Sequence, residues 1–289
     1  MLNKFLFNIL LLCSKIPMRV LYFFSDIIYW ANKLLVGYRK KVITENLQNS
    51  FPDKSREEIT EIRDQFYRNF FDYIVETLKS FTLSENEAKV RVQHINQQVF
   101  KDCNEEQKDI ILLAGHVFNW EWITALATII PQEKCHPVYR KINNAFWEEK
   151  LKLIRNRFGN EALEAREVLR KMLHQKKKGD SAYMFVADQT PHFTEIHYGL
   201  TFLNQKTPAF IGYDRLSTKM DLAFVYCEMK KVKRGFYQVN YKRIFPDQEK
   251  FQPYEVVNKF HHLLEGTINK RPDNWLWSHR RWKYQDALK

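Results

Sequence analysis

The sequence predicts an α/β protein in which helices flank a mixed central sheet, preceded by an N-terminal helical segment that associates with a membrane. Three observations lead to this prediction. Short apolar runs alternate with helical patterns from residue 109 onward, which is typical of α/β sheets. Polar residues follow the ends of these runs. The first 41 residues mix basic, aromatic and aliphatic side chains, as membrane-facing segments do.

The composition is that of a folded protein with an anionic partner. Of the 289 residues, 45% are hydrophobic and 15% aromatic, with only 8 Gly, which excludes low-complexity and disordered classes. The formal net charge of +12 indicates nucleic acid, an anionic membrane surface or an acidic carrier protein as the partner. The 4 Cys are widely spaced without a C-x-x-C pair, so neither a metal site nor a disulfide framework is predicted, and no cofactor is expected.

The N-terminal segment, residues 1–41, carries seven basic side chains and one acidic side chain. Its uncharged apolar run, 5–14, is shorter than the roughly 20 residues that cross a bilayer. Arg19, Asp26 and Lys33 recur every seven residues, which places them on one side of a helix with apolar other faces. We therefore expect an interfacial helix over 1–41 and an α/β domain over 42–289. The alternative is a helix packed on the protein's own core.

Local patterns predict the elements of the α/β domain. Ser55 and Glu58 form a capping box that opens a helix with one apolar stripe. Thr207 and Pro208 are typical of an N-cap and a first helical residue. The predicted strands are 109–114, 136–140, 181–187, 222–227 and 236–241, the last two forming a hairpin across 230–234, and the predicted helices are 120–130, 144–158, 162–177, 208–219 and 254–270.

A candidate catalytic pair follows the first of these strands. His116 lies on the turn after 109–114, Glu121 lies in the first turn of the next helix, and Asp188 follows the strand 181–187; the carboxyl ends of strands are where α/β proteins gather functional groups. Histidine suits a base that removes a hydroxyl proton, and a carboxylate on the opposite ring nitrogen fixes its tautomer. We expect Glu121 to orient His116. No Ser or Cys lies within 115–122 to form an acyl-enzyme.

By itself, the H-x-x-x-x-E pattern is weak, because a core histidine and a glutamate at a helix N-terminus produce it by chance. Further motifs are more specific: Val36-Gly37-Tyr38-Arg39-Lys40-Lys41-Val42, Glu45-Asn46-Leu47, Phe51-Pro52, Val138-Tyr139-Arg140, the stretch 155–159, Ala187-Asp188-Gln189, and the aromatic and basic run 275–283. Together with 115–121, they resemble the bacterial lipid A biosynthesis acyltransferases, the family of the lauroyl and myristoyl transferases, over nearly the whole chain.

The resemblance implies an acyltransferase-like fold at the cytoplasmic face of the bacterial inner membrane. It also implies transfer of a fatty acyl group from acyl-acyl carrier protein, or acyl-CoA, to a hydroxyl of a lipid A precursor in lipopolysaccharide biosynthesis. His116 and Glu121 match the family's H-x-x-x-x-(D/E) motif. Residues at other family positions implicated in the site, for substrate binding or stabilisation of an oxyanion or phosphate, are Arg140, Arg155, Arg157, Asp188 and its neighbour Gln189. Solvated helix charges and a structural Asp188 are the alternatives.

Other functions remain as alternatives. The stretches 189–195 and 203–212 are less typical of the family, so a lysophospholipid or aminolipid could replace the glycolipid acceptor. The run 275–283 could stack nucleic-acid bases or lie at a bilayer surface, but a nucleic-acid binder does not need the apolar N-terminus, so no nucleic-acid partner is expected. An esterase would be expected to show a G-x-S-x-G elbow, which the chain lacks. A non-catalytic lipid-binding relative would lack the His–Glu pair.

Overall fold

The computed structural model describes residues 2–175, 178–246, 248 and 250–288. In chain order its elements are α1 (Leu2–Ser14), α2 (Met18–Ala31), η1 (Asn32–Val36), α3 (Lys40–Ser50), α4 (Arg56–Lys79), α5 (Glu85–Arg91), β1 (Val92–Ile95), α6 (Gln98–Glu105), β2 (Asp109–Ala114), η2 (Trp120–Thr128), β3 (Lys134–Tyr139), α7 (Ala145–Arg155), η3 (Arg157–Gly159), β4 (Leu163–Glu164), α8 (Val168–His174), β5 (Ser181–Val186), η4 (Phe193–Glu195), β6 (Gly199–Phe202), β7 (Gln205–Pro208), α9 (Gly212–Ser217), β8 (Leu222–Lys233), β9 (Phe236–Ile244), α10 (Glu255–Lys270), η5 (Pro272–Asn274) and η6 (Gln285–Ala287).

The core is a seven-stranded mixed sheet in the order β1-β9-β8-β2-β5-β3-β4, beside a separate β6-β7 hairpin. Only β8 and β9 pair antiparallel in the large sheet, while the other neighbours are parallel. The predicted fold class, a mixed sheet flanked by helices, is confirmed. Strands β2 and β5 are neighbours at its centre, although 66 residues lie between Ala114 at the end of β2 and Ser181 at the start of β5. This crossover brings two distant parts of the chain together.

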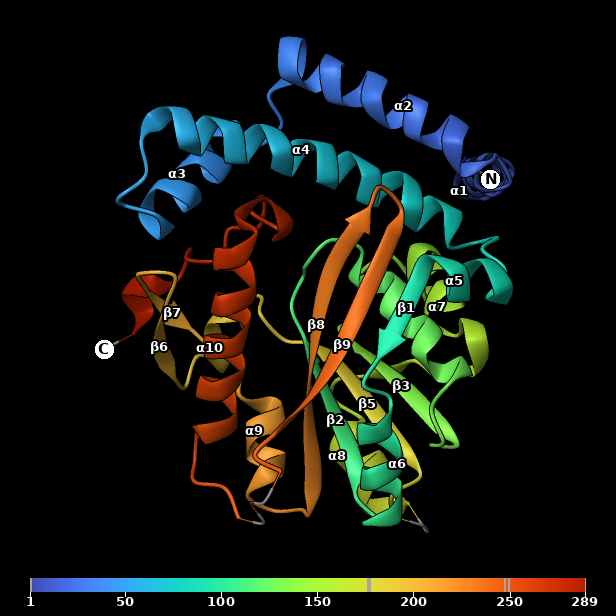
Figure 1. Ribbon diagram of the computed structural model, residues 1–289, viewed down its shortest axis with the longest axis vertical. Coiled ribbons are helices and arrows are strands. Elements are labelled where there is room, and N and C mark those ends of the chain that lie inside the picture. Colours follow the sequence, from blue (N-terminus) through green and yellow to red (C-terminus); the bar gives the residue numbers. More distant parts are fainter. Residues whose placement is uncertain (1, 176–177, 247, 249, 289) are drawn as a thin grey trace.

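Different helices cover the two faces of the sheet (Figure 1). On one face, Tyr226 of β8 lies against Phe260 of α10, with ring centroids 6.2 Å apart. On the other face, Tyr241 of β9 packs edge-on against Phe100 of α6 at 4.8 Å. Tyr241 is paired with Cys227, the neighbour of Tyr226, and successive side chains of a strand point to opposite faces. The two tyrosines therefore belong to opposite halves of the hydrophobic core.

Most predicted elements are present, but the helix predicted to open at Thr207 is wrong. Thr207 and Pro208 end strand β7, and the helix begins only at Gly212. The hydroxyl of Thr207 accepts a hydrogen bond from Trp282 Nε1 at 2.7 Å, and Thr207 is fully buried. The local sequence is compatible with both a strand end and a helix start, and a hydrogen-bond partner 75 residues away favours the strand.

Two other predicted helices differ from the structure. The helix expected over 120–130 is a 3-10 helix, η2, and the hydroxyls of Thr124 and Thr128 donate to carbonyls three residues earlier, Glu121 and Ala125. The helix expected over 162–177 is reduced to α8 and is preceded by strand β4, while residues 176 and 177 lie outside the described residues.

Helix α4 lies across one end of the molecule, and α2 lies along its outer side (Figure 1). The predicted capping box is confirmed: the hydroxyl of Ser55 accepts from the backbone N–H of Glu58, and the carboxylate of Glu58 accepts from the backbone N–H of Ser55. Helix α2 buries Ser25 against α4, where its hydroxyl donates to Asp72 at 2.8 Å. Asp26, expected on the polar side of α2, pairs with Arg234 at 2.8 Å. One face of the N-terminal segment therefore does pack on the protein's own core.

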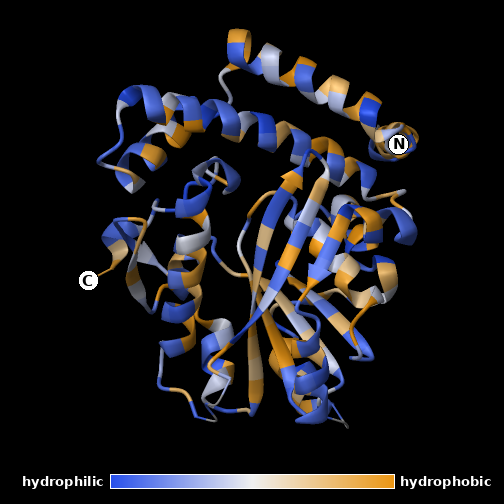
Figure 2. Ribbon diagram, in the orientation of Figure 1, coloured by the Kyte–Doolittle hydropathy of each residue, from blue (hydrophilic) through white to orange (hydrophobic). Residues whose placement is uncertain are grey.

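Apolar residues recur along the N-terminal helices (Figure 2), and many of them are exposed on the face turned away from the core. These exposed side chains include Phe5 and Leu12 of α1, Phe23 and Ile27 of α2, and Leu35. Among the described helices, no single one is long and apolar enough to cross a membrane, whereas the stretches Asn3–Ser14 and Met18–Val36 meet that test together as a pair bent by 117°.

Candidate active site

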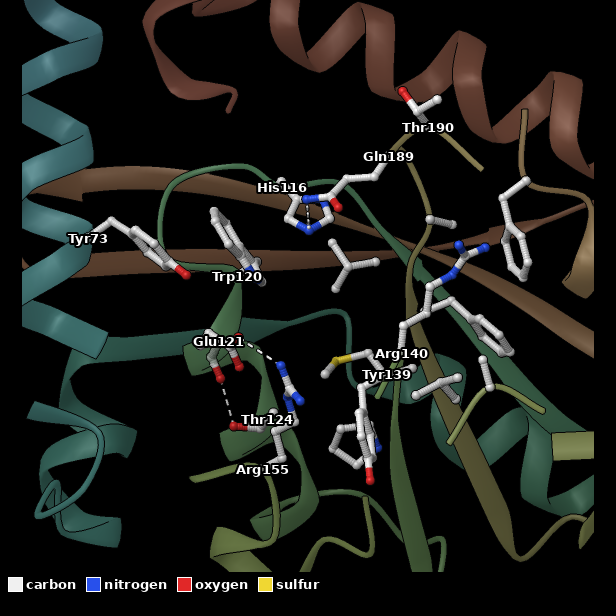
Figure 3. A pocket seen from close by; sticks show the side chains of 18 residues that line it. Tyr73, His116, Trp120, Glu121, Thr124, Tyr139, Arg140, Arg155, Gln189 and Thr190 are labelled. Carbon is white, nitrogen blue, oxygen red and sulfur yellow. Dashed lines mark hydrogen bonds and ion pairs between the residues drawn. The ribbon is translucent and has the colours of Figure 1, made fainter. Parts of the chain in front are cut away.

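A cavity of about 410 Å³ opens at the carboxyl ends of β2, β3 and β5 (Figure 3). Apolar parts of its walls come from β3 and β5, from Trp120 and from Tyr73 of α4, while the turn after β2 contributes His116. The polar side chains that line it include His116, Glu121, Arg140, Arg155 and Gln189. Within the described residues, no group of three or more His, Cys, Asp or Glu side chains could hold a metal ion. The predicted site residues thus meet in one pocket, with the exceptions given below.

The imidazole of His116 is held on both ring nitrogens. Its Nδ1 lies 2.5 Å from Oδ1 of Asp188, and its backbone N–H donates to Oδ2 of the same carboxylate at 3.0 Å. Its Nε2 lies 2.9 Å from the side-chain amide nitrogen of Gln189. A carboxylate accepts only, so a proton on Nδ1 and a lone pair on Nε2 satisfy all three groups at once. This tautomer directs the basic nitrogen toward Gln189 and the cavity.

Asp188 is buried and is fixed as a carboxylate. Besides His116, it accepts a hydrogen bond from Trp275 Nε1 at 2.5 Å. Burial by itself would raise the pKa of Asp188, but the charge of His116 and the hydrogen bonds from His116 and Trp275 outweigh it and hold that pKa well below its usual value. An ionised carboxylate behind the imidazole is what stabilises an imidazolium during proton transfer.

The prediction that Glu121 orients His116 is therefore wrong, because Asp188 and Gln189 occupy the two ring nitrogens. Glu121 instead lines the cavity beside Arg155, with 3.9 Å between Oε1 and a guanidinium nitrogen. The Arg155 guanidinium lies over the ring of Tyr139 at 4.9 Å. Glu121 and Arg155 thus place two opposite charges in the same cavity as His116, but neither side chain bonds the imidazole ring or fixes its tautomer. The pairing of β2 with β5 was the missing signal, since it alone brings Asp188 to His116.

The other two arginines occupy different places. Arg140 lies at the cavity with its side chain about half exposed, paired with Glu195 at 2.7 Å. Arg157 does not line the cavity: it donates to the carbonyl oxygens of Phe81, at 2.9 Å, and Leu83. Burial lowers the pKa of Arg157. Arg157, predicted as a site residue, therefore lies apart from the cavity, and these bonds use its guanidinium to fix the chain after α4.

The C-terminal run 275–283 supports the site from behind. Besides the bond from Trp275, the ring of His279 accepts a hydrogen bond from the backbone N–H of Thr190 at 3.3 Å. Arg281 is fully buried, and burial lowers its pKa to about 10 although the charge of Asp188 opposes this shift. Because Trp275, Trp282 and Arg281 are buried, this run is no stacking surface for nucleic acid. Its structural role was missed because composition suggested an exposed patch.

Comparison with known proteins gives one result that covers the chain. The family model described as "Bacterial lipid A biosynthesis acyltransferase" matches residues 2–284. No curated protein matches the chain. The matched range contains every residue of the cavity, the His116–Asp188 pair and the supporting C-terminal run. The chain belongs to the bacterial lipid A biosynthesis acyltransferase family.

Proposed function

We propose that this protein transfers a fatty acyl group from a carrier thioester to a hydroxyl of a lipid A precursor, with His116 as the general base. The observation that carries the proposal is the hydrogen-bonded arrangement of His116, whose Nδ1 is fixed by buried Asp188 while Nε2 is directed to the cavity. A base needs an unprotonated nitrogen within reach of the acceptor hydroxyl and a partner that stabilises the imidazolium. The nitrogen of His116 that faces the cavity and the Asp188 carboxylate behind the ring support this role.

The reaction would proceed by direct attack. The acceptor hydroxyl displaces the Gln189 amide from Nε2, gives its proton to that nitrogen, and its oxygen forms a bond to the thioester carbon. The oxyanion then collapses, the carbon–sulfur bond breaks, and the leaving thiolate takes the proton from the imidazolium. Asp188 balances the imidazolium charge between these two steps. Arg155, and Arg140 if it leaves Glu195, supply fixed positive charge for the oxyanion or for an acceptor phosphate.

Acyl-acyl carrier protein is the donor that we propose, with acyl-CoA as the alternative. The net charge of +12 favours an acidic carrier, because long-range attraction raises the association rate. For the acceptor, a lipid A precursor follows from the family, while a lysophospholipid or an aminolipid offers the same hydroxyl chemistry.

The proposal is tested with purified protein in detergent. Labelled acyl-acyl carrier protein or acyl-CoA is supplied with a lipid A precursor, a lysophospholipid or an aminolipid, and products are identified by mass spectrometry. We expect an acylated lipid A precursor and a higher rate with the carrier protein, an advantage that shrinks as salt is raised. Release of free fatty acid at the same rate with and without acceptor would instead indicate an esterase.

We also propose that the exposed apolar face of α1 and α2 binds the cytoplasmic face of the bacterial inner membrane. Phe23 is 62% exposed and Ile27 48% exposed, and aromatic and aliphatic side chains beside basic residues favour anionic bilayers. The double substitution Phe23→Glu and Ile27→Glu should lower flotation with anionic phospholipid vesicles severalfold. The matched control is Leu173→Glu on α8, where the leucine is 67% exposed. Equal flotation of both variants would contradict this surface.

A further inference from the structure

The turn that carries His116 has an unfavourable backbone. Phe118 has a φ of 47°, the left-handed region that a bulky side chain adopts only when its surroundings impose it. On one side, the backbone N–H of Phe118 donates to the carbonyl of Asn274 at 2.8 Å, and the N–H of Leu276 donates to the carbonyl of His116 at 3.1 Å. The C-terminal run therefore holds one side of the turn.

Glu76 of α4 holds the other side. Asn119, the residue after Phe118, is fully buried and donates its amide to Oε2 of Glu76 at 2.9 Å. The same carboxyl group accepts from the hydroxyl of Tyr22 of α2 at 2.7 Å and from that of Tyr237 of β9 at 2.9 Å. Glu76 is itself fully buried. One carboxyl group thus joins the N-terminal helix, the sheet and the catalytic turn.

A second observation shows that the Tyr22 hydroxyl has a place built for it. A Cβ on Gly235, at the tip of the β8–β9 hairpin, would lie 2.1 Å from that hydroxyl oxygen. The position of α2 is fixed around it, because Arg234 bonds both Asp26 of α2 and Asp72 of α4. A buried carboxyl group costs more free energy than an apolar side chain of similar size. Stability alone therefore does not require a polar side chain at position 76.

We propose that Glu76 is a positioning residue that holds the His116 turn through Asn119, and that Tyr22 of α2 completes this anchor. The N-terminal helices then contribute to turnover as well as to membrane binding. The inference rests on the proposed function, because its effect is measured on acyl transfer. It goes beyond that function in assigning catalytic consequences to residues that touch neither substrate nor His116.

The test uses full-length Tyr22→Phe, Asn119→Ala and the double variant, assayed in detergent so that membrane concentration plays no part. Asn119→Ala should lower kcat by about 10- to 100-fold, because small displacements of a catalytic group cost that much. Tyr22→Phe should lower kcat by about three- to tenfold, the factor that one hydrogen bond is worth. The acceptor KM should stay within about twofold, and the double variant should be little worse than Asn119→Ala, since both act through Glu76.

Controls separate positioning from loss of folding. Tyr183→Phe removes another hydroxyl that bonds a side chain, that of Gln175 at 2.9 Å, near the N-terminal end of β5, and should leave kcat unchanged at a similar loss of melting temperature. Burial raises the pKa of Glu76 above its usual value, so Glu76→Gln, which keeps an oxygen for Asn119, should retain most of kcat, while Glu76→Ala should match Asn119→Ala.

The outcomes also separate this inference from the proposed function. The assay is valid if the wild-type protein transfers the acyl group and the His116→Ala variant does not. If folded Asn119→Ala and Tyr22→Phe then keep wild-type kcat, or if Tyr183→Phe loses as much kcat as Tyr22→Phe, the positioning role is overturned while the acyl transfer stands. If the wild-type protein transfers no acyl group, the proposed function fails first.

Discussion

Replacing His116 with alanine should lower acyl transfer by about 10²- to 10⁴-fold, the usual contribution of a general base. Among the described residues, only His116 both bonds the Asp188 carboxylate through a ring nitrogen and lines the cavity. The substitution removes this connection. It leaves Trp275 bonded to Asp188, so the support behind the site persists. The measurement is kcat with donor and acceptor both saturating, together with a melting curve.

A suitable control is His174→Ala, which removes an exposed histidine of α8 whose ring bonds the carbonyl of Arg170, four residues earlier. This variant should keep wild-type kcat. Near-normal turnover by a folded His116→Ala protein would overturn the proposed mechanism, because among the described residues that line the cavity no other histidine could take its place as the base.

Asp188→Asn should be almost as damaging, with a loss of roughly 10³- to 10⁴-fold in kcat. The asparagine can still accept from Trp275 and from the backbone of His116, but its NH₂ group then faces Nδ1. Neutral imidazole responds by moving its proton to Nε2, which removes the lone pair that accepts the substrate proton. The fold should be largely preserved because the substitution conserves shape. The measurement is kcat, with the melting temperature showing that the variant is folded.

A double-mutant cycle distinguishes Asp188 from Glu121. If Asp188 acts through His116, the variant with both His116→Ala and Asp188→Asn should be little worse than His116→Ala alone. Glu121→Gln leaves the hydrogen bonds of His116 intact and acts on the charge near Arg155. Its loss should combine differently with that of His116→Ala. If Glu121→Gln is non-additive with His116→Ala and Asp188→Asn is additive, Glu121 rather than Asp188 serves the histidine.

The sequence by itself determined the fold class and much of the site. Apolar runs and helical periodicity gave β2, β5 and the β8–β9 hairpin, because burial on both faces or on one stripe leaves a local pattern. The Ser55–Glu58 capping box was predictable because both partners lie within one turn. His116 and Asp188 could be placed at strand ends because a short apolar run precedes each of them in the chain. Each of these features depends on residues that are close in the chain.

The tertiary structure decided which of these residues meet. Asp188 rather than Glu121 reaches His116 because β5 pairs with β2. The order of strands in a sheet cannot be predicted from local sequence patterns. Thr207 ends a strand because Trp282 bonds it from 75 residues away, and the aromatic and basic run 275–283 is largely buried because it packs behind the site. Arg157 lies outside the cavity because its guanidinium bonds backbone carbonyls after α4. In each case a hydrogen bond or packing contact between distant segments outweighed a local preference that is compatible with several structures.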